Sequence, residues 1–257
     1  MKDQFVIMCV ESAQDVSVLL PWGRHFAERL NHKGLMLLHV SKERGDERWL
    51  EESGVPYASL VGEWHTAIEG LATAFNGILA LVAVDASVRR GSLSYPARLL
   101  REFRDCKVAY LCVPKGVSLL PRGGEVALTF TYRREGKEKL LWASYLTRFV
   151  GCRVTIAHRD YRDGGFRSQL ANNLRFADKL FKPLDVSYAT VVLRKGGNVD
   201  MAAVEQLDPD VLIARTTDAR DRDLLDWLMP LPERRLLGRS TPVLFLNPRE
   251  DLYIRCD

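Results

Sequence analysis

A succession of short apolar runs and longer amphipathic segments, repeated once, most constrains what this chain can fold into. Five apolar runs of strand length come first, at residues 5–11, 34–41, 56–61, 78–84 and 108–113. Five more follow after a break, at residues 126–131, 152–158, 186–193, 211–214 and 242–247. Segments with apolar residues at helical spacing lie between them, at residues 16–31, 63–76, 95–104, 137–150, 165–181, 201–207 and 224–237. Strands that alternate with helices predict an α/β fold with helices on both faces of a parallel sheet.

Two features refine this fold class. The apolar runs are nearly continuous rather than alternating, which is typical of strands that are covered on both faces. Right-handed crossovers then favour a doubly wound, flavodoxin-like or Rossmann-like sheet in each half. The break between the halves, PKGVSLLPRGGE at 114–125, contains two prolines and three glycines, as linkers do. We therefore predict two tandem domains, residues 1–116 and 124–257.

Prolines and glycines also predict where helices begin and end. Pro21 is expected in the first turn of the first helix, where its missing N–H does no harm. Gly77 is expected to end the helix over 63–76 in a left-handed conformation. Pro230 and Pro232 are expected to interrupt the helix over 224–237.

Composition excludes several classes of protein. The chain has 257 residues, of which 47% are hydrophobic and 27% charged, and these are values of an ordinary globular protein. The net charge of +4 comes without a long Lys/Arg run, so we expect no nucleic-acid partner. No stretch approaches the roughly 20 apolar residues of a membrane span, and the start lacks the pattern of a signal peptide. Five scattered cysteines without CxxC spacing favour a reduced, cytoplasmic compartment and no metal site.

The order and spelling of the strands resemble a known family. The opening FVIMCVES, the second run GLMLLHV, and the two final runs VAYLCVP and PVLFLNP are similar to strands of universal stress proteins. Because the pattern occurs twice, the chain resembles a tandem, two-domain member of that family. The resemblance implies a flavodoxin-type sheet in each half and pairing of 108–113 with 242–247 in a pseudo-dimer. Another five-stranded α/β pair, flavodoxin-like or receiver-like, is the alternative.

The first half departs from the pattern that this resemblance implies for ATP binding. ATP-binding members carry G-x2-G-x9-G-[ST] after the fourth strand, but the matching positions here are Asp85, Val88, Arg98 and Leu99. The resemblance places Glu11 and Val40 at positions that face the nucleoside. Nearby, RRGS at 89–92 forms either a small anion-binding loop or a plain surface turn. The candidate nucleotide-binding residues are therefore Glu11, Val40, Asp85, Arg89, Arg90, Gly91 and Ser92.

The second half differs further. It has no glycine between its fourth strand and Gly238, and no acid directly after its first strand. Its strand ends carry arginines instead, and guanidinium groups bind carboxylates and phosphates well. The candidate anion-binding residues are Arg133, Arg134, Arg159, Arg215 and Arg220. Aspartates in the same loops leave open the alternative of a surface ion-pair network.

Catalytic motifs are absent from the sequence. The five histidines show no HxH or HExxH spacing, and neither GxSxG nor a Walker motif occurs. His39 and His158 end equivalent strands and are expected to be structural. We therefore expect a non-enzymatic, cytoplasmic stress-response or regulatory protein without a cofactor, which binds a protein partner or a small anionic ligand. The alternatives are an ATP- or AMP-binding protein that uses the first half and a purely structural scaffold; a homodimer is left open.

Overall fold

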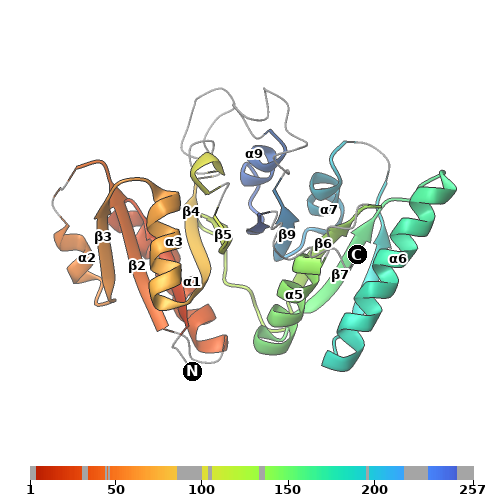
Figure 1. Cartoon of the computed structure of the whole chain (residues 1–257), viewed down its shortest axis with the longest axis horizontal. Helices are drawn as coiled ribbons and strands as arrows, with labels where there is room; N and C mark the ends of the chain where they lie inside the picture. Colours follow the sequence, from red (N-terminus) through yellow and green to blue (C-terminus); the bar gives the residue numbers. More distant parts are fainter. Residues whose placement is uncertain are drawn as a thin grey trace, which may run out of the picture.

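A computed structural model describes residues 4–30, 34–43, 45, 47–85, 100–103, 106–132, 137–194, 197–216 and 231–247. Its centre is one sheet of ten strands (Figure 1). The first half contributes β1 (Phe5–Val10), β2 (Gly34–Ser41), β3 (Tyr57–Val61), β4 (Gly77–Val84) and β5 (Ala109–Pro114). The second half contributes β6 (Glu125–Phe130), β7 (Arg153–His158), β8 (Tyr188–Val192), β9 (Val211–Arg215) and β10 (Val243–Leu246).

The strand order is β3-β2-β1-β4-β5-β10-β9-β6-β7-β8, so each half repeats the same doubly wound order. All neighbours within a half are parallel. The halves meet where β5 and β10 pair antiparallel, with Leu111 opposite Leu244 and Tyr110 opposite Phe245. This confirms the predicted fold class and the predicted pairing of the two last strands. Because these two strands cover each other, neither is an open sheet edge.

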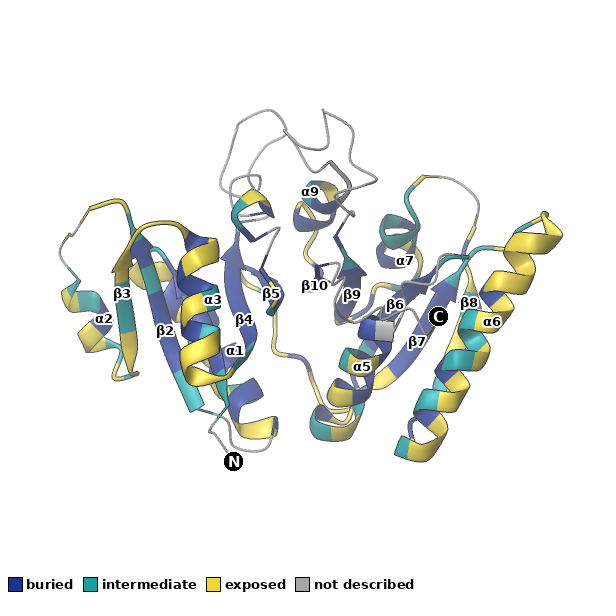
Figure 2. Cartoon of the chain, viewed as in Figure 1, coloured by how far each residue is buried: buried dark blue, intermediate teal, exposed yellow. Residues whose placement is uncertain are grey.

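Helices cover both faces of the sheet (Figures 1 and 2). They are α1 (Ala13–Arg29), α2 (Arg48–Glu52), α3 (Trp64–Phe75), α5 (Lys137–Tyr145), α6 (Gly164–Phe181), α7 (Val199–Leu207) and α9 (Leu231–Leu237). A π-helical turn, Leu146–Val150, continues α5, and a 3-10 turn, Lys182–Leu184, follows α6. In β1, Val6 and Met8 pack into the core layer beneath α1, whereas Ile7 and Cys9 pack into the layer beneath α3. None of the helices described is long and apolar enough to cross a membrane.

The prediction for Pro21 was wrong, because α1 begins earlier than expected. Ser12 and Asp15 form a capping box that starts the helix at Ala13, so Pro21 lies in its interior. The hydrogen bond that Pro21 cannot donate would go to the carbonyl of Ser17. Both residues are exposed, so water can reach that carbonyl, which explains why the helix continues.

The prediction for Gly77 was also wrong. Asn76, with φ of 52°, ends α3 in the left-handed conformation, and Gly77 is the first residue of β4. Gly77 is small for another reason: a Cβ there would lie 2.6 Å from Cδ1 of Ile7. Pro232 lies in the first turn of α9, a position that proline tolerates.

Several other expectations fall partly or wholly outside the described residues. Of the predicted helix 95–104, only residues 100–103 are described, and they are helical. Pro230 and half of the predicted segment 224–237, residues 224–230, lie outside as well. The short helix α2 had not been predicted, since it is little more than a single turn without a full amphipathic period. The predicted helix 137–150 is present as α5, but its last turn is π-helical.

Aromatic rings and one amide hold the two halves together. Tyr110 and Phe245, both fully buried, stack with ring centroids 5.4 Å apart. The side chain of Asn247, just after β10, donates to the carbonyl oxygens of Phe103 and Cys106 at 2.6 and 2.7 Å. It also accepts a hydrogen bond from Oγ1 of Thr216 at 2.7 Å. The two bonds to carbonyl oxygens join residues more than 140 positions apart in sequence.

Candidate functional site

Each half has one point where the strand order reverses, between β1 and β4 in the first half and between β6 and β9 in the second. In open α/β sheets, ligands bind beyond the carboxyl ends of the strands at such switch points. The residues that follow these four strands are therefore the first to consider. The two switch points are described in turn.

At the first switch point the structure brings two predicted residues to the same edge. Glu11 follows β1 and Asp85 follows the adjacent parallel strand β4, and both are half-buried. Val40 lies near the end of β2 but belongs to the buried core layer beneath α3. The remaining predicted residues, Arg89, Arg90, Gly91 and Ser92, lie outside the described part of the chain.

A third carboxylate at this switch point was missed by the sequence analysis. Oδ2 of Asp15, a buried residue in the first turn of α1, accepts hydrogen bonds from the backbone N–H groups of Glu11 and Ser12 at 3.0 and 3.1 Å. The amino end of α1 is therefore occupied by the protein's own carboxylate. The signal was the S-x-x-D spacing at 12–15, which is a form of the capping box. Three carboxylates near one strand edge disfavour a polyphosphate.

The two histidines at strand ends have structural contacts. Nδ1 of His39 lies 2.9 Å from the carbonyl oxygen of Val10 and therefore donates to it, which fixes the tautomer. The His39 ring also meets Trp49 edge to face, with centroids 5.3 Å apart. Nδ1 of His158 lies 3.1 Å from the carbonyl oxygen of Arg159.

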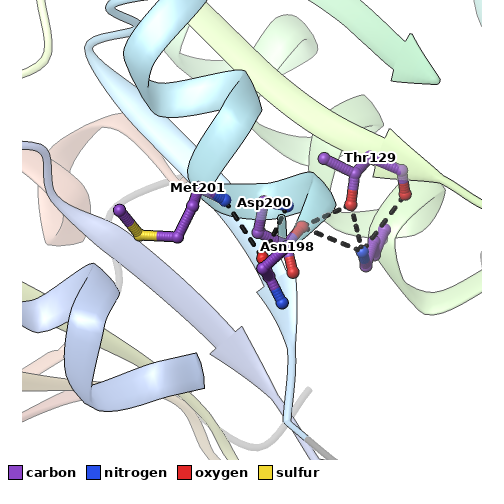
Figure 3. A network of polar contacts seen from close by, with 5 residues as sticks. Thr129, Asn198, Asp200 and Met201 are labelled. Carbon is purple, nitrogen blue, oxygen red and sulfur yellow. Dashed lines mark hydrogen bonds and ion pairs between the residues drawn. The ribbon is translucent and has the colours of Figure 1, made fainter. Parts of the chain in front are cut away.

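At the second switch point a buried lysine is the central feature. Lys139, in the first turn of α5, is 7% exposed, and its Nζ donates to the carbonyl oxygen and to Oγ1 of Thr129 at 3.2 and 3.0 Å. Thr129 is near the end of β6 and donates its hydroxyl hydrogen to Oδ1 of Asp200 (Figure 3). The same Oδ1 lies 3.9 Å from the Lys139 ammonium. We call Thr129, Lys139 and Asp200 the buried triad.

The start of α7 holds the acidic member of the triad in place. The side chain of Asn198 accepts from the backbone N–H groups of Asp200 and Met201 at 2.9 and 3.1 Å (Figure 3). Asp200 is in the first turn of α7, where the helix dipole favours a negative charge. The triad thereby joins β6, α5 and α7 at the switch point. Its members were missed because they come from three separate segments and form no motif.

Two of the predicted arginines lie at this same edge of the sheet. Arg215 is the last residue of β9, and Arg159 follows β7. Nη2 of Arg159 donates to the carbonyl oxygen of Gly197 at 2.5 Å, just ahead of the Asn198 cap. The other predicted members, Arg133, Arg134 and Arg220, lie outside the described residues. Lys139, Arg159 and Arg215 thus give this edge three cationic side chains.

The acids that could neutralise these arginines are partly engaged elsewhere. Oδ1 of Asp163 accepts from the backbone N–H of Phe166 at 2.9 Å and caps α6. Beside that cap, Phe166 stacks on Tyr132 with centroids 4.1 Å apart, and Tyr161 meets both rings edge to face. Burial raises the pKa of Tyr161. Within the described residues, no three His, Cys, Asp or Glu side chains are placed to hold a metal ion.

Comparisons with known proteins support the fold. No protein-family model matches the sequence, and no curated protein matches it. A solved universal stress protein from Archaeoglobus fulgidus is similar over 98% of both chains, with a TM-score of 0.65 and 11% identity. A Pseudomonas aeruginosa protein named for the same family covers 96% of this chain and 94% of its own, with a TM-score of 0.58 and 15% identity.

A third similar structure is the cytoplasmic domain of a prokaryotic cation chloride cotransporter. It has a TM-score of 0.56 and 14% identity, and the match covers 95% of this chain and 96% of that domain. At such identities a likeness concerns the fold and leaves function to the individual sites. The chain therefore has the fold of the universal stress proteins, as the resemblance of its strands implied.

Proposed function

We propose that this chain is a non-catalytic protein of the universal stress type that binds a small anionic ligand at the switch point of its second half. The observation that carries the proposal is the opposite charge of the two switch points. Glu11, Asp15 and Asp85 surround the first. The second has Lys139, Arg159 and Arg215, with the carboxylate of Asp200 lying 3.9 Å from the Lys139 ammonium.

The geometry of the second site supports side-chain rather than backbone recognition. Arg159 and Arg215 end two strands of one parallel sheet, so their side chains leave the same edge. Guanidinium forks are suited to the paired oxygens of a carboxylate or phosphate. The buried triad lies beneath them and fixes the relative positions of β6, α5 and α7. No glycine loop is required for an anion held in this way.

The buried triad itself is unsuited to catalysis. A threonine hydroxyl beside a carboxylate and an ammonium has the composition of an activated nucleophile. However, Thr129 is only 3% exposed and Lys139 only 7%, so a substrate cannot reach the hydroxyl. The triad's hydrogen bonds instead satisfy groups that would be costly to bury alone. This burial supports a binding role without turnover.

Adenine-nucleotide binding in the first half is the competing function, and the charges argue against it. A triphosphate there would approach Glu11, Asp15 and Asp85, which repel it without a counter-ion. We further propose that a protein partner recognises the ligand-bound form of this chain. The likeness to a cotransporter's cytoplasmic domain shows that a chain of this fold can form one part of a larger protein.

A thermal-shift titration tests the proposal with inorganic phosphate, AMP, and ATP with and without Mg²⁺. We expect an anion to raise the melting temperature saturably, since a ligand at 100 times its Kd stabilises the fold by about 2.7 kcal/mol. Arg215→Gln should abolish the shift. Arg153→Gln is the matched control, because Arg153 begins β7 at the opposite edge of the same half.

Two outcomes would overturn the proposal. The first is no shift with any of these anions at millimolar concentration. The second is a shift that Arg215→Gln leaves unchanged. A shift seen with ATP and Mg²⁺ alone, retained in Arg215→Gln but lost in Asp85→Lys, would move the site to the first half and support the nucleotide-binding alternative.

A further inference from the structure

A cavity of about 510 Å³ lies at the end of the sheet opposite to both switch points. It is lined by Gly77 and Ile78 at the amino end of β4 and by Ala109 at the amino end of β5, with Val108 just ahead of β5. One wall comes from α3 of the first half and the other from α5 of the second. The cavity therefore exists only because the two halves are joined, and its volume is typical of small-molecule sites.

The wall from α5 is aromatic. Leu141, Trp142 and Tyr145 line it, and the rings of Trp142 and Tyr145 lie 6.0 Å apart. Leu141 is 47% and Tyr145 45% exposed, so this helix presents large apolar side chains to the cavity mouth instead of burying them. Exposed apolar surface of this kind, next to a concave site, is a feature of ligand contact.

The wall from α3 has small side chains and one acidic residue. Ala72 and Thr73 leave room there, and Oγ1 of Thr73 donates to the backbone carbonyl of Glu69 at 2.7 Å, which directs that hydroxyl hydrogen along the helix. Glu69 is half-buried, so its carboxylate is the less solvated of the two charges on the lining. Lys107, the other charged residue, is exposed at the rim, where solvent screens it.

From this lining we propose that the cavity binds a small aromatic amine. The ring would lie against Trp142 and Tyr145, and the ammonium group would face Glu69. Aromatic rings stack on one another, so the α5 wall matches the ring of such a ligand, and the Glu69 carboxylate on the α3 wall matches its charge. The site is independent of the anion site, because it lies at the other end of the sheet and selects the opposite charge.

Phenethylamine and 3-phenylpropionate are suitable probes, because they share a ring and a chain and differ in the sign of their charge. Binding is followed by thermal shift and by quenching of tryptophan fluorescence. We expect phenethylamine to bind saturably and 3-phenylpropionate to bind at least tenfold more weakly. Glu69→Gln should weaken phenethylamine binding about tenfold, which corresponds to the loss of one charge-assisted contact.

Two leucine substitutions in α3 form a matched pair. Ala72→Leu fills the cavity and should abolish binding, whereas Ala74→Leu, on an exposed position outside the cavity, should leave it unchanged. Tyr145→Ala, at an exposed position, tests the aromatic wall without filling the core and should weaken binding. Equal binding of the two probes, no saturable binding of either, or full binding by Ala72→Leu would each overturn the proposal. Phosphate titrations of the same variants report separately on the anion site.

Discussion

The side chain of Asn247 is predicted to be a main support of the contact between the halves. It donates to two carbonyl oxygens of the first half and accepts from Thr216, and both Asn247 and Thr216 are 7% exposed. Three hydrogen bonds of about 1 kcal/mol each would be lost in Asn247→Ala. The carbonyl of Phe103 keeps its bond from the backbone N–H of Cys106, whereas the carbonyl of Cys106 loses the partner described here. We therefore expect the free energy of unfolding to fall by about 3 kcal/mol.

Urea denaturation and thermal melting measure this loss. For a chain of this size, about 3 kcal/mol lowers the melting temperature by about 6–12 °C. A double-mutant cycle with Thr216→Val isolates the contact between the two side chains, because residues that share a hydrogen bond are not additive. The double variant should be less destabilised than the sum of the single variants. A loss below about 1 kcal/mol for Asn247→Ala, or strict additivity in the cycle, would refute the reasoning.

Further predictions concern glycine, aspartate and cysteine positions. Gly70 is at an exposed helix position where a Cβ meets nothing within 4 Å, so Gly70→Ala should raise the free energy of unfolding by about 0.5–1 kcal/mol in urea denaturation. Gly77→Ala should instead lower the free energy of unfolding by about 1–3 kcal/mol, because the added Cβ would contact Ile7. Asp208→Gly should raise the melting temperature, since Asp208 is left-handed with φ of 45° at the end of α7. Burial raises the pKa of the Cys106 thiol from its ordinary value of 9.0 to about 11, so this thiol ionises at lower pH in the unfolded chain than in the folded protein. The contribution of the neutral, buried thiol to stability is therefore complete below pH 9.0 and should be lost as the pH rises to about 11. Consistent with this, a thiol reagent at neutral pH should leave Cys9, Cys106, Cys112 and Cys152 unmodified until the protein is denatured, and rapid labelling of any of them in the native protein would contradict the burial.

The sequence was sufficient for the fold because its signals are local and repeated. Continuous apolar runs predict strands covered on both faces, and the resemblance to universal stress proteins implied which two strands meet in the middle. Helix ends were predicted less well. Pro21 suggested a later start than the capping box of Ser12 and Asp15 dictates, and Gly77 suggested a cap that Asn76 provides. The predicted domain boundaries, 1–116 and 124–257, stay a prediction.

The candidate sites were predicted only in part, for a physical reason. Residues that end strands can be read from the sequence, and Glu11, Asp85, Arg159 and Arg215 do lie at the carboxyl edge. The buried triad has members about 10, 61 and 71 positions apart, so no local spacing reveals it. The cavity between α3 and α5 is set by how the halves meet. Its lining looks like ordinary helix surface in the sequence.

The register of the sheet shows that the two halves are not interchangeable. In the first half, Ile7, the third residue of β1, is level with Tyr110 of β5 across the intervening strand β4. In the second half, Ala127, the third residue of β6, is level with Val243 of β10 across the intervening strand β9. Four residues after Tyr110 the first half has Pro114, and four residues after Val243 the second half has Asn247, so these two residues occupy equivalent positions. A proline side chain has no donor, so the bonds that Asn247 makes to the first half have no counterpart in the opposite direction. Two first halves paired with each other would lack this contact altogether. The contact between the halves therefore favours one first half against one second half, and this allows the two switch points to carry opposite charges within a single sheet.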